Sequence, residues 1–191
     1  MSRFGQLVDL DTITPINVGL TSASEETMIS LLGRPRDVNS TECNNAKASD
    51  TVKRLSVLQS VGPFRVTGIK PAVDSLREVF AEAKQQEAKL WDALGSEGML
   101  CVRLRKPTSG KPSTKLSNHS WGTALDIKVD GVADGKRDRK VQLGIAILIP
   151  IFNQHGWFAG AGFTTAEDDM HFEVATETLN TWARTGLLNP S

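Results

Sequence analysis

The segment 117–129 constrains the fold of this chain more than any other. It carries five residues at fixed intervals: Ser117, His119, Gly122, Ala124 and Asp126. Gly122, Thr123 and the β-rich run over 125–129 disfavour a helix, so we predict a loop that carries His119, a turn at Gly122, and a strand over 124–129. Gly122 permits a positive φ or a close backbone approach. Because side chains alternate along a strand, Ala124 and Asp126 are expected on one face.

A second polar cluster follows at residues 168–173, which read Asp-Asp-Met-His-Phe-Glu. With His119 and Asp126, His171 completes a set of two imidazoles and one carboxylate. Such a set can hold a zinc ion and leave the fourth position open for water. A solvated acidic turn is the alternative interpretation of residues 167–169, and a surface loop is the alternative for His119. The remaining histidine, His155, is expected to cap the end of a helix.

The complete pattern, Ser-x-His-x-x-Gly-x-Ala-x-Asp with an acidic residue three positions before a later His, resembles the zinc D-alanyl-D-alanine peptidase family. That family includes D,D-carboxypeptidases, dipeptidases and L-alanyl-D-glutamate endolysin peptidases. The resemblance covers about residues 60–185. It implies one Zn²⁺ ion bound by His119, Asp126 and His171, with attack by a zinc-bound water and Asp168 as general base. Mn, Co or Ni could occupy such a site in vitro, but this donor set suits zinc best.

The family also uses an arginine on an upstream strand to stabilise the anionic intermediate. We predict a strand over 99–105 with Arg103 and Arg105 on one face, Arg103 being the first choice and an exposed strand edge the alternative for both. Ser117 is expected to contact substrate. Glu173 is expected to brace one of the ligand imidazoles. Asp168 is preferred as the base over its acidic neighbours because it has the family's spacing.

The resemblance implies a peptidoglycan stem peptide as substrate, cleaved at D-Ala-D-Ala or D,D-cross-link bonds. An L-alanyl-D-glutamate endopeptidase is the alternative, acting as a lysin or as an injected antibacterial effector with a cognate immunity protein as partner. An alternative of another class is a non-catalytic zinc-binding module of the same fold, as in the Hedgehog signalling domain. The presence of Asp168 argues against that module, because a protein that only binds has no use for a base.

Length and charge set further limits. The 191 residues suggest one domain with an N-terminal extension. The resemblance implies a zinc peptidase domain at 56–191, and the extension at 1–55 is expected either to be part of the same globule or to be flexible. The 22 Lys and Arg residues balance 22 Asp and Glu residues, which argues against a general nucleic-acid binder. The apolar run 143–152 is too short to span a bilayer, so no stable membrane insertion is expected. Cys43 and Cys101 form either one disulfide or two buried thiols.

The first residues lack the apolar stretch of a secretory signal. We therefore expect synthesis in the cytoplasm and action in the periplasm or cell wall, after lysis-type release or specialised secretion.

Strands and helices do not alternate along the chain. This order predicts an α+β fold, an antiparallel sheet with helices packed on one face and the zinc site on the other. Four helices are expected: one opened by a capping box at Ser22, one from Pro71 to Gly95, one over 138–155, and a last one over about 177–185 that Thr176 caps.

Overall fold

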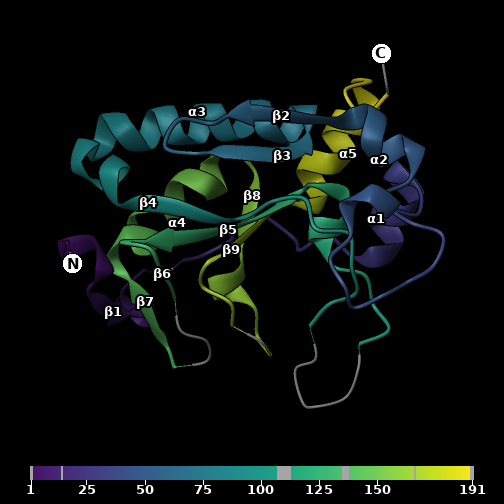
Figure 1. Cartoon of the computed structure of the whole chain (residues 1–191). Helices are drawn as coiled ribbons and strands as arrows, with labels where there is room; N and C mark the ends of the chain where they lie inside the picture. The colour runs from purple at the N-terminus through teal and green to yellow at the C-terminus, as the bar shows by residue number, and fades with distance from the viewer. Residues whose placement is uncertain (1, 14, 107–112, 135–137, 166, 190–191) are drawn as a thin grey trace.

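The computed structural model describes residues 2–13, 15–106, 113–134, 138–165 and 167–189 (Figure 1). Its central sheet is antiparallel, with the strand order β4 (Leu94–Gly98), β5 (Ala124–Val129), β9 (His171–Val174) and β8 (Trp157–Ala159), and with β6 (Val132–Ala133) paired to β5. Two antiparallel pairs lie outside it: β1 (Leu7–Asp9) with β7 (Lys140–Gln142), and β2 (Ser56–Ser60) with β3 (Arg65–Ile69).

The helices pack beside the sheets (Figure 1). The α-helices are α1 (Glu25–Leu32), α2 (Asp50–Leu55), α3 (Lys70–Gln86), α4 (Leu143–Gln154) and α5 (Thr176–Arg184). Short 3-10 helices are η1 (Arg3–Gly5), η2 (Leu10–Ile13), η3 (Asn45–Lys47), η4 (Ala88–Ala93), η5 (Asn118–Trp121) and η6 (Gly160–Gly162). Among the described residues, none of these helices combines the length and the apolar character needed to cross a membrane.

The two faces of the central sheet differ in chemistry. On one face Leu125, Ile127 and Val129 of β5 are fully buried. Phe172 of β9 stacks on Phe152 of α4, with ring centroids 4.0 Å apart, so α4 covers this face. Asp126 and His171 alternate with these apolar residues and therefore lie on the opposite face. The predicted α+β architecture, with helices on one face of an antiparallel sheet and the candidate metal site on the other, is confirmed.

Two predicted helices have different ends in the structure. The helix that Pro71 opens ends at Gln86 rather than at Gly95. Residues 94–98 instead form β4, in which Leu94 pairs with Val129 of β5. The helix expected over 138–155 begins only at Leu143, because residues 140–142 pair with β1. In both cases pairing with a distant strand prevails over a local helical pattern. The sequence of the segment alone does not reveal that pairing.

The predicted strand over 99–105 is wrong. Within it, Leu104 alone makes β-type pairing, as an isolated bridge to Leu116. The side chain of Asn45 accounts for the difference: its Oδ1 accepts from the Val102 N–H (3.0 Å), and its Nδ2 donates to the Leu100 carbonyl (2.9 Å). An amide side chain thus satisfies backbone groups that a neighbouring strand would otherwise pair with.

Residues 20–33 pack beside the candidate site rather than apart from it. Ser24, not Ser22, caps α1, since its Oγ accepts from the Thr27 N–H (3.1 Å). The indole N–H of the buried Trp121 donates to the carbonyl of Gly33, where α1 ends (2.8 Å). Farther along the chain, Cys43 and Cys101 are paired as a disulfide, the first of the two alternatives that the sequence left open.

Gly122 occupies a position that only glycine suits. Its φ is +67°, and a Cβ built on it would lie 2.8 Å from the Cα of Gly68. We expect Gly122→Ala to lower the free energy of unfolding by roughly 2–4 kcal/mol, from left-handed backbone strain together with this contact. The matched control is Gly131→Ala, which has a φ of +76° but open space at the Cβ and is expected to cost about 1 kcal/mol.

Urea unfolding of the two variants and the unchanged protein measures both values. Equal losses for Gly122→Ala and Gly131→Ala would show that the close approach of residues 68 and 122 carries no energy of its own.

Candidate metal centre

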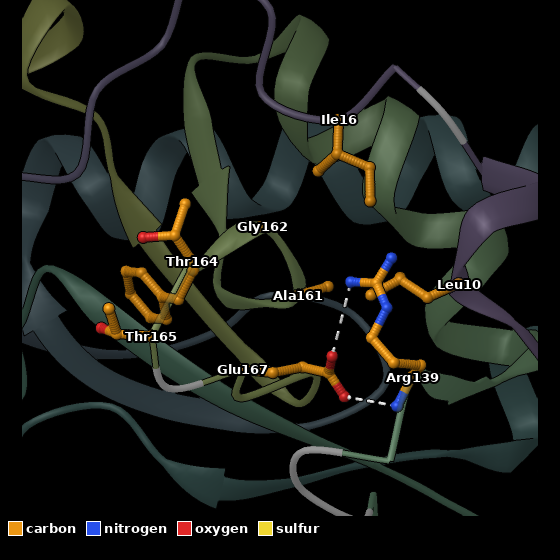
Figure 2. Close-up of a pocket in the computed structure, with 9 residues that line it drawn as sticks. Leu10, Ile16, Arg139, Ala161, Gly162, Thr164, Thr165 and Glu167 are labelled. Atoms are coloured by element: carbon orange, nitrogen blue, oxygen red, sulfur yellow. Dashed lines mark hydrogen bonds and ion pairs between the residues drawn. The ribbon is translucent and has the colours of Figure 1, made fainter.

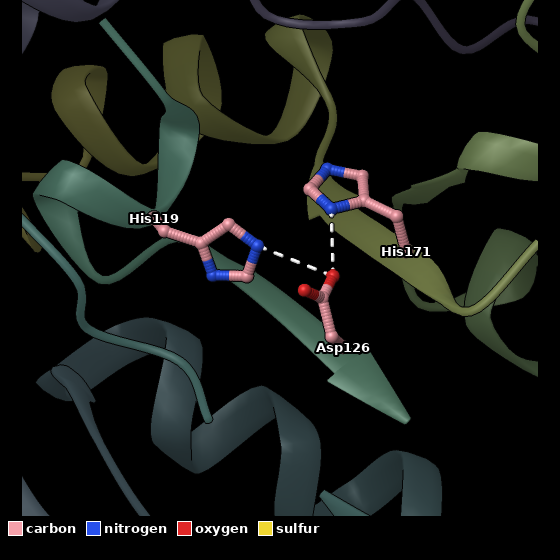
Figure 3. Close-up of side chains that lie close together, drawn as sticks. All are labelled: His119, Asp126 and His171. Atoms are coloured by element: carbon pink, nitrogen blue, oxygen red, sulfur yellow. Dashed lines mark hydrogen bonds and ion pairs between the residues drawn. The ribbon is translucent and has the colours of Figure 1, made fainter. Parts of the chain in front are cut away.

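Three side chains converge on the polar face of the sheet (Figure 3). Oδ1 of Asp126 lies 3.2 Å from Nε2 of His119 and 3.0 Å from Nδ1 of His171. One ligand atom from each residue falls within 4.8 Å of the others, and both histidines are buried. The sequence proposed these same three residues as metal ligands, and the structure brings them together.

The strand register and one turn position these groups. Asp126 of β5 stands directly opposite His171 of β9, so their side chains leave the sheet side by side. His119 reaches them from η5, which ends at Gly122 in a left-handed conformation. The carbonyl of Gly122 accepts from the Ile69 N–H (3.1 Å), which ties the turn to β3. The loop, turn and strand predicted for residues 117–129 are therefore present, with the loop coiled into a short 3-10 helix.

Each imidazole has its second ring nitrogen occupied. Nδ1 of His119 lies 2.9 Å from the Met99 carbonyl oxygen, and Nε2 of His171 lies 3.1 Å from Oε2 of Glu173. An acceptor at one nitrogen places the proton there and leaves the other nitrogen as a lone-pair donor. The other two nitrogens, Nε2 of His119 and Nδ1 of His171, face Asp126. The donor set of two imidazoles and one carboxylate, oriented in this way, fits a zinc ion.

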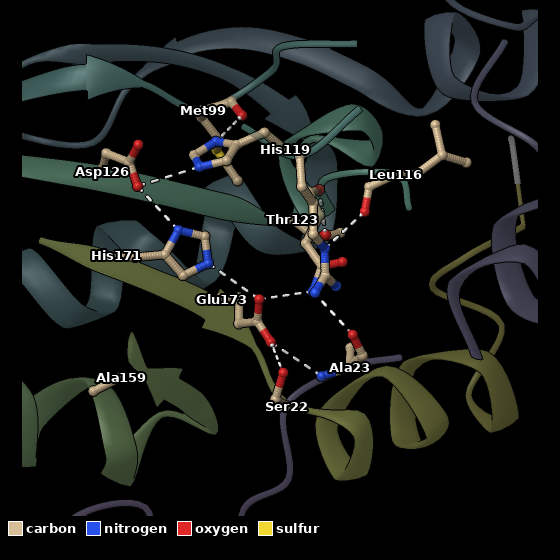
Figure 4. Close-up of polar contacts among 12 residues, drawn as sticks. Ser22, Ala23, Met99, Leu116, His119, Thr123, Asp126, Ala159, His171 and Glu173 are labelled. Carbon is tan, nitrogen blue, oxygen red and sulfur yellow. Dashed lines mark hydrogen bonds and ion pairs between the residues drawn. The ribbon is translucent and has the colours of Figure 1, made fainter. Parts of the chain in front are cut away.

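Glu173 is the centre of a buried hydrogen-bond network (Figure 4). Its Oε1 accepts from the Ser22 hydroxyl (2.6 Å) and the Ala23 N–H (3.1 Å), and its Oε2 accepts from Nδ2 of Asn118 (2.7 Å). The sequence singled out Glu173 but missed its three other partners. Asn118 lies inside the first motif and Ser22 has the composition of a helix cap, so neither carried a signal of its own.

Charge is concentrated in this network. Burial acts to raise the pKa of Asp126, but the hydrogen bonds from His119 and His171 prevail and hold that pKa well below its usual range. Burial acts to lower the pKa of His171, but the hydrogen bonds with Asp126 and Glu173 prevail and raise it to about 10. Burial acts to raise the pKa of Glu173, but the hydrogen bond and charge of His171, together with the hydrogen bonds from Ser22 and Asn118, prevail and lower it. A bound cation would take the place of the imidazole proton.

Asp168 lies in the turn that leads into β9. Its N–H donates to the Gly160 carbonyl (3.1 Å), and its own carbonyl accepts from the His171 N–H (3.0 Å). The two neighbouring acids are placed differently: Glu167 is buried at 7% exposure, and Asp169 is fully buried at 0%, whereas Asp168 is only half-buried. Burial, followed by the charge of Glu167, raises the pKa of Asp169 to about 8.

The predicted arginines do not share one face of a strand. Nη1 of the half-buried Arg103 donates to the Leu104 carbonyl (2.9 Å), and Nε of the exposed Arg105 donates to the Leu116 carbonyl (3.0 Å). Ser117 is buried at the start of η5, and its N–H donates to the Arg103 carbonyl (3.1 Å). The backbone of Arg103 thus lies against the segment that carries His119.

The third histidine stands away from this cluster. His155 ends α4, as expected, and its Nε2 lies 2.9 Å from Oε2 of Glu82 on α3.

Arg139 and Glu167 are among the residues that line a pocket of about 410 Å³ (Figure 2). Phe163 lines it and also lies against His171, with ring centroids 5.9 Å apart. Across the pocket, Nη1 of Arg139 lies 3.8 Å from Oε2 of Glu167. Phe163 is therefore shared between the pocket and the surroundings of His171, and residues 139 and 167 form a polar part of the pocket wall.

Comparison with known proteins bears on the segment that carries all three ligands. Residues 111–174 match the D-alanyl-D-alanine carboxypeptidase family model. The match confirms the resemblance drawn from the two motifs, over about a third of the chain, and it is narrower than the expected range of 60–185. Searches of curated proteins and of solved structures found no match.

Glu173 lies at the end of the segment that matches this family, and its contacts allow a direct test of its role. In Glu173→Gln one oxygen becomes an NH₂ group, which only donates and cannot accept the hydrogen bonds that Asn118 and His171 make to Oε2. We expect zinc affinity to fall about 10–100-fold, because the brace on the imidazole is lost. Competition with a chromogenic zinc chelator measures this. The matched control is Glu177→Gln, whose exposed carboxylate accepts from the Thr21 N–H (2.9 Å) and touches neither imidazole. Equal affinity for both variants would contradict the bracing role.

Proposed function

We propose that this protein is a zinc-dependent peptidase that hydrolyses peptidoglycan stem peptides at D-Ala-D-Ala or D,D-cross-link bonds. One observation carries the proposal: the ligand atoms of His119, Asp126 and His171 converge within 4.8 Å inside the segment that matches the carboxypeptidase family. Three protein ligands leave a coordination position open, which is typical of catalytic rather than structural zinc sites.

The ligand chemistry supports zinc over other metals. Imidazole nitrogens with a single carboxylate suit zinc, whereas calcium and magnesium prefer sites built from oxygen alone. When bound, a zinc ion lowers the pKa of water to about 7 and polarises a carbonyl group. The acceptors at Met99 and Glu173 hold both imidazoles in the orientation that this requires.

Asp168 is the proposed general base. It accepts a proton from the attacking water and returns it to the leaving amine. Its position supports this role better than that of its neighbours, since it is half-buried while Asp169 is fully buried and Glu167 accepts two backbone N–H bonds. Arg103 is the proposed partner of the anionic intermediate, because its backbone packs against η5 and its guanidinium group has further donors besides the one that Leu104 engages.

Digestion of purified muropeptides tests the proposal. The zinc-loaded protein is incubated with pentapeptide monomers and cross-linked dimers, and the products are identified by mass spectrometry. We expect loss of one D-Ala from the pentapeptide or conversion of dimers to monomers. A cut between L-Ala and D-Glu would instead identify the endopeptidase of the lysin type. No product from any muropeptide, with one zinc bound per chain, would identify a zinc-binding module without peptidase activity.

A further inference from the structure

A second cluster of ligand atoms lies next to the metal centre and shares no residue with it. Carboxylate oxygens of Asp138, Glu167 and Asp169 fall within 4.8 Å of one another. Asp138 precedes β7, and the other two precede β9, so the cluster joins two segments that are distant in the sequence. The two neighbours of Asp168 thus belong to this cluster and not to the imidazole site.

Asp169 is the unusual member. It is fully buried, and neither of its carboxylate oxygens accepts a hydrogen bond from the residues that the structure describes. Burying a carboxylate without a partner costs several kcal/mol, and buried polar atoms are rarely left in that state. The other two members of the cluster, Asp138 and Glu167, are also acids, and an ionised carboxylate cannot donate a hydrogen bond. A positively charged ligand would stabilise the ionised form of this buried carboxylate.

Glu167 is held in place for such a ligand. Its Oε1 accepts from the backbone N–H groups of Asp138 (3.2 Å) and Arg139 (3.1 Å), which fixes the carboxylate against the other segment (Figure 2). The Arg139 guanidinium lies 3.8 Å from Oε2 of Glu167 and also pairs with Asp11. Because Arg139 is shared between Glu167 and Asp11, the cluster of three carboxylates keeps an excess of negative charge.

We propose that Asp138, Glu167 and Asp169 bind one Ca²⁺ ion. The cluster contains only oxygen ligands, which select hard cations over zinc. Oxygens on opposite sides of a Ca²⁺ ion are about 4.8 Å apart at a Ca–O distance of about 2.4 Å, so the spacing fits without rearrangement. Asp138 is exposed, which leaves an entry path and room for water molecules as further ligands.

The ion would clamp the turn before β9 to the segment before β7. Asp168 lies between two of the ligands, so the ion would also position it; this consequence rests on the proposed function, whereas binding itself does not. The pocket is lined by Glu167 and Arg139, so the clamp also shapes that wall.

Calorimetric titration of the zinc-loaded, calcium-depleted protein with CaCl₂ tests the site directly. We expect one Ca²⁺ per chain and a rise in Tm of at least about 5 °C at a hundredfold excess over Kd. Asp169→Asn is expected to abolish the rise, and Asp138→Asn to weaken binding at least about tenfold. Because residue 138 is exposed, the second variant remains informative if the first does not fold.

Two controls separate this site from the imidazole site. Asp92→Asn, at an exposed carboxylate outside the cluster, is expected to retain the full rise in Tm. His119→Ala is expected to lose zinc and still bind Ca²⁺, so failure of one site is distinguishable from failure of the other. No heat and no change in Tm would overturn the proposal and indicate that Asp169 carries a proton instead. Tighter binding of Mg²⁺ than of Ca²⁺, or unchanged binding by Asp138→Asn, would overturn the assignment of the ion or of its ligands.

Discussion

Replacement of His119 by alanine should remove zinc from the protein and lower the rate of muropeptide hydrolysis at least about a thousandfold. Nε2 of this residue is one of three converging ligand atoms. The two remaining ligands fall short of the three that a catalytic zinc site uses. The metal contributes several kcal/mol of transition-state stabilisation, and about 4 kcal/mol corresponds to a factor of about a thousand. Zinc content by mass spectrometry of the metal and product formation from muropeptides measure both effects.

His155→Ala is the matched control for this experiment. The residue is also a histidine with a carboxylate partner, Glu82, but it lies at the end of α4, outside the ligand cluster. We expect it to retain one zinc ion per chain and full activity. Stoichiometric zinc and unchanged turnover in His119→Ala would refute the assignment of the centre.

Asp168→Asn is expected to lower kcat by about 10²–10⁴-fold while zinc remains bound. Asparagine has almost the same shape, and the backbone bonds of residue 168 to Gly160 and His171 do not involve the side chain. The loss would therefore come from the missing base rather than from a displaced turn. Parallel measurement of kcat and zinc content checks the two parts of the prediction.

The same variant separates an enzyme from a binding module. A module that only holds zinc has no use for a base, so Asp168→Asn would leave its zinc content and its partner binding unchanged. Within the enzyme hypothesis, full activity in Asp168→Asn would exclude this residue as the base. Glu167→Gln and Asp169→Asn then test the shifted assignments that the sequence left open.

The ligand set was predictable from sequence because strand geometry relates position to direction. Ala124 and Asp126 had to share a face, and β-branched residues around them specified a strand. Gly122 signalled the turn, since only glycine combines a positive φ with a backbone approach of this kind. The register that places Asp126 opposite His171 depends on how two distant strands pair, so local preferences do not predict it. Only the family resemblance of the two motifs indicated that these residues would meet.

Other expectations failed where a distant segment supplied the competing interaction. The strand expected at Arg103 and Arg105 is absent because Asn45 occupies the backbone groups of residues 100 and 102. Ser22 looked like a helix cap, yet its hydroxyl donates to Glu173. Neither partner lies within fifty residues along the chain, so no local pattern could reveal it.

By itself, then, the sequence determined the chemistry of the centre: two imidazoles, a carboxylate, and the strand and turn that carry them. Local backbone preferences and side-chain alternation are sufficient for that, because they act within a few residues. The tertiary structure alone decided what surrounds those groups: the Met99 carbonyl and Glu173 behind the imidazoles, and Ser22 and Asn118 behind Glu173. It alone also placed Asp138 against Glu167 and Asp169. Buried polar groups must find partners wherever the folded chain provides them, and that requirement is met in space rather than along the sequence.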